Sequence, residues 1–311
     1  MTNAGGSRLP DHRELQVDVL IPHFNDPDGL ELSLKTVATQ AWPGRFRVVI
    51  VDDGSSSDNR SAVETLLAEQ AGDDTFVLVG NAENRGRPFT RNVLLDHIDS
   101  PYVAWLDAGD EWYPDKTRLQ LERLRAIESG GSGDGAWITC NYDWQWVGRR
   151  PKPRRQSTKG DQVKLLLGGS RLRAYLWTLL GSAQSFEAIG RFDEKLPRLQ
   201  DLDFFLRFVE SGGVLHSPAT KASLCKYNKS DVGRNADEVR ACYGYIYEKH
   251  RKQYQSYGRH FVRHQLYKME MHAARFAKNN NQVGKKRYYQ WQAFRRWPRR
   301  FINEEILGST K

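Results

Sequence analysis

Acidic side chains cluster at three places in this 311-residue chain, and each place could do chemistry. Asp52 and Asp53, followed by glycine, can accept hydrogen bonds from a ribose or from the imide N–H of a pyrimidine base. Asp107 and Asp110 lie just past an apolar stretch, where carboxylates can hold a divalent ion against a diphosphate. Asp201 opens a helical pattern, and a carboxylate there can take a proton from a hydroxyl. Taken singly, each cluster also has an ordinary explanation as a helix cap or a turn.

Alternating strands and helices position these clusters. Stretches rich in Val and Ile predict strands, and the segments between them have helical spacing of apolar residues. This alternation predicts an α/β fold with a mostly parallel sheet covered by helices on both faces. Such sheets bind ligands beyond the carboxyl ends of their strands, which is where the Asn, Asp and Gly clusters fall. The predicted strands are 17–22, 46–51, 76–79 and 102–106, and the predicted helices are 30–40, 62–70, 91–98 and 116–129.

The second half of the chain follows a looser pattern. Residues 137–146 alternate like a strand, and 148–155, with two prolines and no acid, predicts a solvated loop. Residues 201–211 and 236–278 predict helices, the second one broken near 256–258, and a last helix ends before Pro298. We therefore expect a flexible leader at 1–14, an α/β domain at 15–230 and a basic helical region at 231–311.

Composition limits the class of protein. With 39% apolar and 27% charged residues, the chain is globular and large enough to bury a full core. No apolar run approaches the roughly 20 residues that span a bilayer, so we expect no integral membrane segment. Residues 1–10 lack the apolar stretch of a secretory signal, and three scattered cysteines are too few for a disulfide framework or a zinc knuckle. These features favour a cytoplasmic location.

Charge is unevenly distributed. Residues 221–311 hold 21 Lys and Arg against 7 Asp and Glu, whereas residues 1–220 hold 26 against 31. A basic pole attracts polyanions such as nucleic acid, anionic lipid or acidic substrates. Residues 285–301 carry seven cations and six aromatic side chains without an acid. This pattern fits a helix on an anionic membrane surface, a nucleic-acid-binding helix, or a packed helix with its cations in water.

One pair of histidines has metal-ligand spacing. His260 and His264 lie one helical turn apart, a spacing that can bind zinc. No third ligand or nearby acid completes the set, so we expect an ordinary helix surface there.

Six signals in a fixed order resemble family 2 glycosyltransferases. The resemblance covers roughly residues 17–229. It implies the GT-A fold, a nucleotide-diphosphate-sugar donor and an inverting displacement at the anomeric carbon. The segments that carry it are Ile21–Asn25, Val51–Ser56, Asn84–Gly86 with Arg91 and Asn92, Leu106–Trp112, Ile189–Glu194 and Gln200–Arg207.

The resemblance also implies roles for single residues. Asp201 falls where the family has its catalytic base, and such help is worth roughly 100- to 10,000-fold. Gln200 replaces the Glu that is common before that base, which lowers the local negative charge. Asp107 begins the acidic motif, and with Asp110 it is implied to hold a divalent metal ion, Mn²⁺ or Mg²⁺. The residues implied to meet the nucleotide are Pro22, Phe24, Asn25, Asp52, Asp53, Arg87, Arg91 and Asp107.

Gly109 departs from the family pattern. The family usually writes this motif as Asp-x-Asp-Asp, and its third position, the metal ligand, is glycine here. Three readings follow: Asp107 or Asp110 takes over the ion, basic side chains neutralise the diphosphate without metal, or the site is inactive. The basic candidates are Lys226, Lys229 and Arg234.

The sequence therefore predicts an inverting glycosyltransferase of bacterial cell-surface polysaccharide synthesis. Its donor would be a nucleotide-diphosphate sugar, UDP-sugar by default, and its acceptor a hydroxyl of a glycan or lipid-linked molecule. We expect it at the cytoplasmic face of the membrane, with the C-terminal helices on anionic lipid. Two rivals are an inactive nucleotide-sugar or glycan-binding scaffold and a polyanion-binding protein. Nucleic acid is the weaker partner, because it leaves the three acidic clusters unexplained.

Overall fold

The computed structural model describes residues 16–70, 75–131, 135–146, 149–229 and 235–307. The chain divides into two compact units, and each is described by itself. The described part of the first unit falls within 1–158, 175–192 and 212–229; the second takes in 159–174, 193–211 and residues from 230 onward. Two segments that the sequence assigns to the α/β domain, 159–174 and 193–211, thus group with the C-terminal helices. The predicted leader lies outside the described residues.

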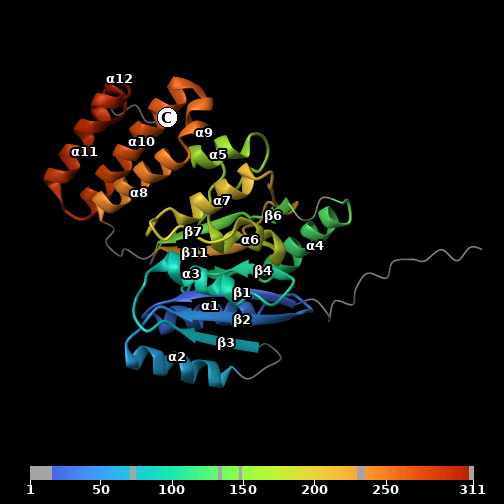
Figure 1. Cartoon of the computed structure of the whole chain (residues 1–311). Helices are drawn as coiled ribbons and strands as arrows, with labels where there is room; N and C mark the ends of the chain where they lie inside the picture. Colours follow the sequence, from blue (N-terminus) through green and yellow to red (C-terminus); the bar gives the residue numbers. More distant parts are fainter. Residues whose placement is uncertain (1–15, 71–74, 132–134, 147–148, 230–234, 308–311) are drawn as a thin grey trace, which may run out of the picture. The chain divides into compact units, whose positions relative to one another are not determined.

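A seven-stranded sheet lies at the centre of the first unit (Figure 1). Its strand order is β10-β6-β9-β4-β1-β2-β3, and only β9 runs antiparallel to its neighbours. The predicted α/β class with a mostly parallel sheet is therefore confirmed. The strands are β1 Gln16–His23, β2 Arg45–Asp52, β3 Thr75–Gly80, β4 Tyr102–Trp105, β6 Ala136–Ile138, β9 Leu180–Ser182 and β10 Val214–His216.

A second sheet has the order β5-β11-β7-β8. Its strands are β5 Glu111–Trp112, β11 Cys225–Lys229, β7 Tyr142–Trp146 and β8 Lys152–Arg154. The predicted strand 137–146 was wrong as one element, because the chain leaves the first sheet after β6 and enters the second at β7. The predicted loop 148–155 contains β8, an exposed edge strand in which Pro153 is tolerated because an edge has one unpaired side.

Helices cover the first unit; α1 to α4 lie where the apolar spacing predicts helices, whereas α6 and η3 were not predicted. They are α1 Pro27–Ala38, α2 Ser57–Glu69, α3 Arg87–Asp96, α4 Lys116–Glu128, α6 Ala183–Ile189 and the short 3₁₀ turn η3 Leu176–Thr178. In α1, Leu30, Leu34 and Val37 are buried, and the Asp26 side chain caps the first turn by accepting from the Gly29 N–H. Proline at the first helical position suits a turn whose N–H has no partner in the helix.

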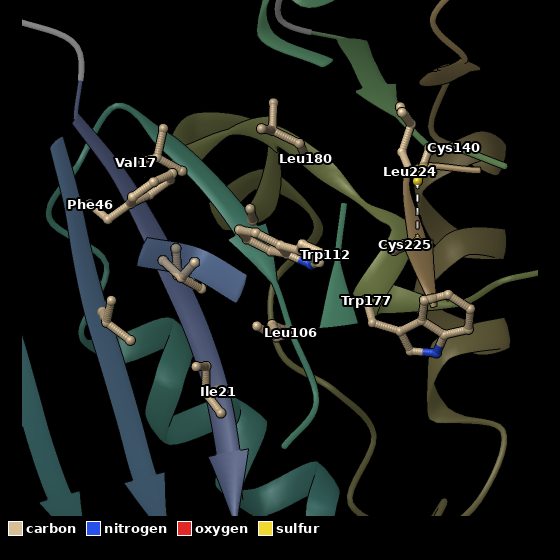
Figure 2. Close-up of a cluster of buried hydrophobic side chains, with 14 of the residues drawn as sticks. Val17, Ile21, Phe46, Leu106, Trp112, Cys140, Trp177, Leu180, Leu224 and Cys225 are labelled. Carbon is tan, nitrogen blue, oxygen red and sulfur yellow. Dashed lines mark hydrogen bonds between the residues drawn. The ribbon is translucent and has the colours of Figure 1, made fainter. Parts of the chain in front are cut away.

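The core of the first unit joins both sheets (Figure 2). Val17 and Ile21 of β1 and Trp112 of β5 are buried in one apolar cluster. Cys140 and Cys225 lie in the same cluster as free thiols, with their Sγ atoms 3.4 Å apart. Because β5 and β11 are anchored in this core, the loop between β4 and β5 has two fixed ends.

The second unit is helical. Its elements are α5 Gln162–Gly168, α7 Gln200–Glu210, α8 Ala236–Lys249, α9 Arg251–Ser256, α10 Gly258–Asn279, α11 Val283–Arg296, α12 Pro298–Phe301 and the π turn η4 Ile302–Ile306. The predicted break near 256–258 is confirmed, and a further break falls at His250. Buried alanines let α10 and α11 pack closely side by side (Figure 1). Within the described residues, no helix combines the length and apolar character that crossing a membrane requires.

Candidate functional site

Asp52 ends β2 and joins it to β1. The parallel register sets Asp52 opposite His23, and the His23 Nδ1 lies 2.9 Å from the Asp52 Oδ1. The Asp26 N–H donates to the His23 Nε2 at 3.2 Å, so Nδ1 carries the ring proton and donates to Asp52. The backbone N–H and the hydroxyl of Ser55 also donate to this carboxylate. Asp52 therefore orders the carboxyl ends of both strands.

Asp53 holds the loop between β3 and α3. Its carboxylate accepts from the Asn81 side chain at 2.8 Å and from the N–H groups of Arg85 and Gly86 at 2.9 and 2.8 Å. Gly54 lets that loop approach, because its φ is +71° and a Cβ there would lie 2.4 Å from the Glu83 carbonyl carbon. A carboxylate can accept about four hydrogen bonds, so Asp53 retains room for one more. Its predicted contact with a nucleotide stays a prediction.

The loop after β1 presents an aromatic ring beside these carboxylates. Phe24 is 47% exposed, the next residue Asn25 is also exposed, and Pro22 is half-buried. Asn25 adopts a left-handed backbone with φ of 49°, and its Oδ1 accepts from the Ser56 N–H at 2.9 Å. The loop is thus tied to the start of α2. An exposed ring on a fixed loop is a stacking surface for a flat base.

Arg91 is buried in α3 and supports Asp107. Its Nη2 lies 3.0 Å from the Asp107 Oδ1, and its guanidinium lies 5.8 Å from the centroid of the Phe192 ring. The Asp107 side chain keeps 26% of its surface exposed. Arg87 is exposed at the first turn of α3, and its charge offsets only part of the rise that burial causes in the pKa of Asp110. Of the two predicted arginines, then, Arg91 orients the acidic motif and Arg87 remains open to solvent.

Two segments clamp the loop from Asp107 to Glu111. Ser33 of α1 accepts from the Gly109 N–H at 3.0 Å and donates to the Asp110 carbonyl at 2.7 Å. Asn228 of β11 donates its N–H to the Asp110 Oδ1 at 3.0 Å and its side-chain amide to the Gly109 carbonyl at 2.9 Å. Gly109 has φ of +90°, so the glycine in place of the expected ligand belongs to a backbone shape that other residues rarely adopt.

Asp110 is a buried carboxylate with one unsatisfied oxygen. The residue is 3% exposed, and its Oδ2 has no hydrogen-bond partner within the described structure. Burial, followed by the nearby Asp107 charge, raises the pKa of Asp110 well above its usual range. A cation beside this oxygen would give it a partner and would offset the repulsion between the Asp110 and Asp107 carboxylates. The described residues contain no group of three His, Cys, Asp or Glu that could hold a metal by themselves.

The two acidic clusters lie at the same edge of the sheet. The Gly109 N–H donates to the Gly29 carbonyl at 2.9 Å, and a Cβ on Gly109 would lie 3.7 Å from the Asp26 Oδ2. The loop after β1 therefore touches the loop after β4. This places Asp52, Asp53, Asp107 and Asp110 around the carboxyl ends of adjacent strands, as the strand pattern predicts.

The basic candidates of β11 are less available than the sequence indicates. Lys226 lies opposite Glu111 in the sheet, and its Nζ is 2.5 Å from the Glu111 Oε1. The Lys229 side chain and Arg234 lie outside the described residues. Sequence reasoning passed over Asn228 and Ser33, which hold the acidic loop in place. The alternation of β11 was the available signal for Asn228, since it shares a face with Lys226.

Asp201 belongs to the second unit, in the first turn of α7. Leu199 precedes the helix in a left-handed backbone with φ of 62°, and buried phenylalanines fix the face of the helix that follows. Asp201 is half-buried at this first turn. Its predicted role as base stays a prediction.

A buried charge network begins two residues further along α7, in the same first turn. The Asp203 carboxylate contacts His250 Nε2 at 3.1 Å, Lys249 Nζ at 2.8 Å and Arg207 Nε at 3.0 Å. Burial raises the pKa of Asp203, but hydrogen bonds from His250 and Lys249 and the charges of Lys249 and Arg207 outweigh it and lower that pKa to about 2. The His250 pKa is raised, because bonds to Asp203 and Glu210 outweigh its burial.

The histidine pair of α10 packs on an aromatic ring. His260 and His264 have ring centroids 4.9 and 5.8 Å from that of Trp297. Burial, followed by the charges of Arg300 and Lys268, lowers the pKa of His264 to about 4. The pair forms part of an aromatic contact between α10 and the end of α11.

Solved structures share this architecture. The chain aligns with S. aureus TarS 1–349 in complex with UDP at a TM-score of 0.57 and 14% identity, over 91% of each chain. It aligns with the mannosyltransferase PcManGT from Pyrobaculum calidifontis, in complex with GDP-Man and Mn²⁺, at a TM-score of 0.56 and 17% identity, over 98% of this chain and 79% of that one. These likenesses show the fold, which is GT-A, and confirm the fold class that the resemblance implies.

Sequence relatives cover part of the chain. The putative teichuronic acid biosynthesis glycosyltransferase TuaG of Bacillus subtilis is 34% identical over 106 residues, 34% of this chain and 40% of that protein. The amylovoran biosynthesis glycosyltransferase AmsB of Erwinia amylovora is 26% identical over 200 residues, 63% of this chain and 64% of that protein. The chain thus spans less than two thirds of either relative. The model of "Glycosyl transferase family 2" matches residues 18–178, just over half of the chain. This chain therefore belongs to glycosyl transferase family 2.

Proposed function

We propose that this protein is an inverting glycosyltransferase that uses a nucleotide-diphosphate sugar. The observation that carries the proposal is the position of two acidic clusters, Asp52 with Asp53 and Asp107 with Asp110, at the same carboxyl edge of the first sheet. Asp53 has one acceptor direction left for a ribose or base, and Phe24 offers a ring for stacking. Membership of family 2 supports the same chemistry. UDP is the default nucleotide, and the TarS complex with UDP supports that choice.

The residues present fit a divalent metal ion held together with a diphosphate. Mg²⁺ and similar ions are commonly bound through one or two carboxylates, with substrate phosphates and water as the other ligands. Asp107 is partly exposed, and the orphaned Oδ2 of Asp110 is the second available oxygen. An ion there would neutralise charge on the departing nucleoside diphosphate. Mn²⁺ in the mannosyltransferase complex supports this cofactor.

Asp201 is the proposed base. Its carboxylate would take the proton of the acceptor hydroxyl, whose oxygen then attacks the anomeric carbon from the face opposite the leaving diphosphate. The bond from that oxygen to the sugar forms as the bond to the diphosphate breaks, so the configuration inverts. Arg91 and Asn228 bind no substrate in this scheme; they hold Asp107 and Asp110 in place.

The proposed acceptor is a hydroxyl of a glycan or lipid-linked glycan in bacterial polysaccharide synthesis. The names of TuaG and AmsB, which refer to teichuronic acid and amylovoran biosynthesis, support that class. We place the protein at the cytoplasmic side of the cell envelope, as a peripheral protein whose basic C-terminal helices contact anionic lipid. Their 21 cations and 7 acids over residues 221–311 support this location.

Calorimetric titration with UDP, dTDP and GDP, each with and without Mn²⁺, tests the donor site. Metal-dependent binding of one nucleotide is the expected result. Equal nucleotide affinity with and without Mn²⁺ would indicate that basic side chains bind the diphosphate. If none of the three nucleotides binds, the transferase proposal fails and the scaffold reading replaces it.

Asp201→Asn tests the base. The variant is expected to bind nucleotide as the wild type does and to lose sugar transfer roughly 100-fold or more. Donor hydrolysis or transfer to a glycan acceptor gives the readout. Glu69→Gln, at an exposed acid near the end of α2, is the control and should leave both properties unchanged. Equal transfer by Asp201→Asn and the wild type would remove Asp201 from the mechanism.

A further inference from the structure

A groove in the helical unit is lined by arginines. It has a volume of about 560 Å³ and lies along α10 and α11, which are neighbours (Figure 1). Arg259 and Arg263 line it from α10, and Arg295 and Arg296 line it from the end of α11. Val262 and Leu266 supply its apolar wall, and no acidic residue lines it.

These four arginines have no acidic partner among the residues that the structure describes. Cations of other helices in the same unit do: Arg240 of α8 pairs with Glu270 at 2.7 Å, and Arg300 of α12 pairs with Glu304 at 2.6 Å. Residues 258–301 hold 12 Lys and Arg and one acid, Glu270, which Arg240 already occupies. Positive charges thus converge on the groove without compensation from the protein, and an anion placed there would gain from all of them.

The groove is also partly preorganised. The Nε of Arg263 donates to the Arg296 carbonyl at 2.7 Å, and its guanidinium lies 5.3 Å from the centroid of the Trp297 ring. These contacts hold one guanidinium fork at a fixed place between the two helices. A fixed fork loses little side-chain entropy on binding, and its planar N–H groups match the oxygens of a phosphate.

Exposed aromatic rings continue from the groove along α11. Tyr288 and Trp291 are 56% and 57% exposed, and with Arg295 they follow the i, i+3, i+7 spacing of one helix face. Tyr and Trp prefer the boundary between lipid headgroups and acyl chains, where cations meet anionic headgroups. A free anion would make no use of these rings.

We propose that this arginine groove binds the phosphate of an anionic phospholipid headgroup, with Tyr288 and Trp291 at the membrane interface beside it. The inference rests on the membrane association proposed above and names its site and its ligand. It does not involve the acidic clusters of the first unit, so the proposal for the groove and the proposal for the donor site can be tested and refuted separately. Nucleic acid would satisfy the arginines, but its phosphates leave the apolar wall of Val262 and Leu266 unused.

The test is co-sedimentation of the full chain with vesicles of phosphatidylcholine alone or mixed with phosphatidylglycerol. The double variant Arg259→Gln/Arg295→Gln removes two exposed groove cations. Its matched control, Arg275→Gln/Lys278→Gln, removes two exposed cations of α10 outside the groove. We expect the groove variant to bind the mixed vesicles about tenfold more weakly, and the control to lose about threefold or less. An equal loss in both variants would overturn the proposal, since diffuse charge would then explain binding.

Further arms identify the source of the phosphate. Inorganic phosphate, at matched ionic strength, should not displace the protein from vesicles; displacement would assign the groove to a free anion instead. Trp291→Ala should weaken vesicle binding, and unchanged binding would contradict the interfacial geometry. Tighter binding to a single-stranded oligonucleotide than to mixed vesicles would replace lipid with nucleic acid as the ligand. UDP titration of each variant separates a failure here from a failure of the donor site.

Discussion

At the scale of residues, the acidic side chains differ in how many hydrogen bonds the protein already gives to their carboxylate oxygens. Asp52 and Asp53 are held by hydrogen bonds from neighbouring loops, whereas the Asp110 Oδ2 has no partner within the described structure. A carboxylate whose oxygens are largely occupied orders the protein, and one with an open oxygen is available to a ligand. Identical residue types at strand ends can therefore contribute to one site in two different ways.

Asp53→Asn tests the ordering role. An amide cannot accept from the Arg85 and Gly86 N–H groups with both of its ends, so one backbone donor loses its partner. We expect the free energy of unfolding to fall by about 1–3 kcal/mol and UDP to bind about tenfold more weakly. Urea denaturation and calorimetry measure the two effects. Asp58→Asn, at an exposed acid of α2, is the control. A stable variant with unchanged UDP affinity would show that Asp53 neither orders the loop nor meets the nucleotide.

Gly109→Asp tests whether the departure from the family motif is a lost ligand. With φ at +90°, a side chain at this position strains the backbone by about 1–3 kcal/mol, and its carboxylate would start near Asp26. We expect lower stability and no gain in Mn²⁺-dependent UDP binding. Gly160→Asp is a matched control for strain, because Gly160 has φ of +96° and open space around it. Tighter metal-dependent binding by Gly109→Asp would identify glycine as the defect in an impaired site.

At the scale of elements, α7 must hold Asp201 at its first turn, and a charge network around Asp203, two residues later, fixes the helix. Asp203 accepts from groups of two helices, Arg207 of α7 and the Lys249–His250 pair at the end of α8. Glu210 of α7 also contacts His250, and Asp193 shares Lys249. The orientation of α7 against α8 thus depends on charges that change with pH.

The pH dependence of stability follows from these two groups. The Asp203 pKa is about 2 in the folded chain against roughly 3.9 unfolded, so its contribution of roughly 2 kcal/mol is present above about pH 4 and is lost as the pH falls toward 2. Because the pKa of His250 is raised in the folded chain, His250 adds to stability below about pH 6.5, and this stabilisation is lost as the pH rises through the folded pKa. We therefore expect this unit to be most stable between about pH 4 and 6.5. Urea midpoints across that range measure it.

Asp203→Asn should remove the acid limb of this profile. It leaves Lys249 and His250 without their shared carboxylate, and breaking such a buried pair costs about 3–5 kcal/mol near pH 5.5. His250→Gln is the companion variant, which should flatten the alkaline side only. A profile for Asp203→Asn that still declines between about pH 4 and 2 would assign the acid sensitivity to other carboxylates.

At the scale of the whole molecule, the spacing of apolar residues predicted the longer strands and helices. It missed short strands and contacts between residues far apart in the sequence. Strands β1 to β4 belong to apolar stretches long enough to identify, whereas β6, β9 and β10 have three residues each and no readable period. The acidic clusters could be found because strand ends collect turn residues. The alternation of β11 could point to Asn228, but its bond to Asp110 could not be predicted, because the two residues are 118 positions apart and the pairing of β11 with β5 brings them together.

The uneven charge of the chain predicts that nucleotide binding and membrane binding depend on different residues and can be lost independently. The donor candidates lie in a part of the chain with a deficit of cations, and the arginine groove lies where cations are in surplus. Asp53→Asn should therefore lose UDP affinity and keep vesicle binding, while Arg259→Gln/Arg295→Gln should lose vesicle binding and keep UDP affinity. Raising the salt concentration should weaken vesicle binding steeply, because exposed charges are screened within about 10 Å. Calorimetry and co-sedimentation on the same preparations measure both. Loss of both activities in either variant would mean that the two sites depend on each other.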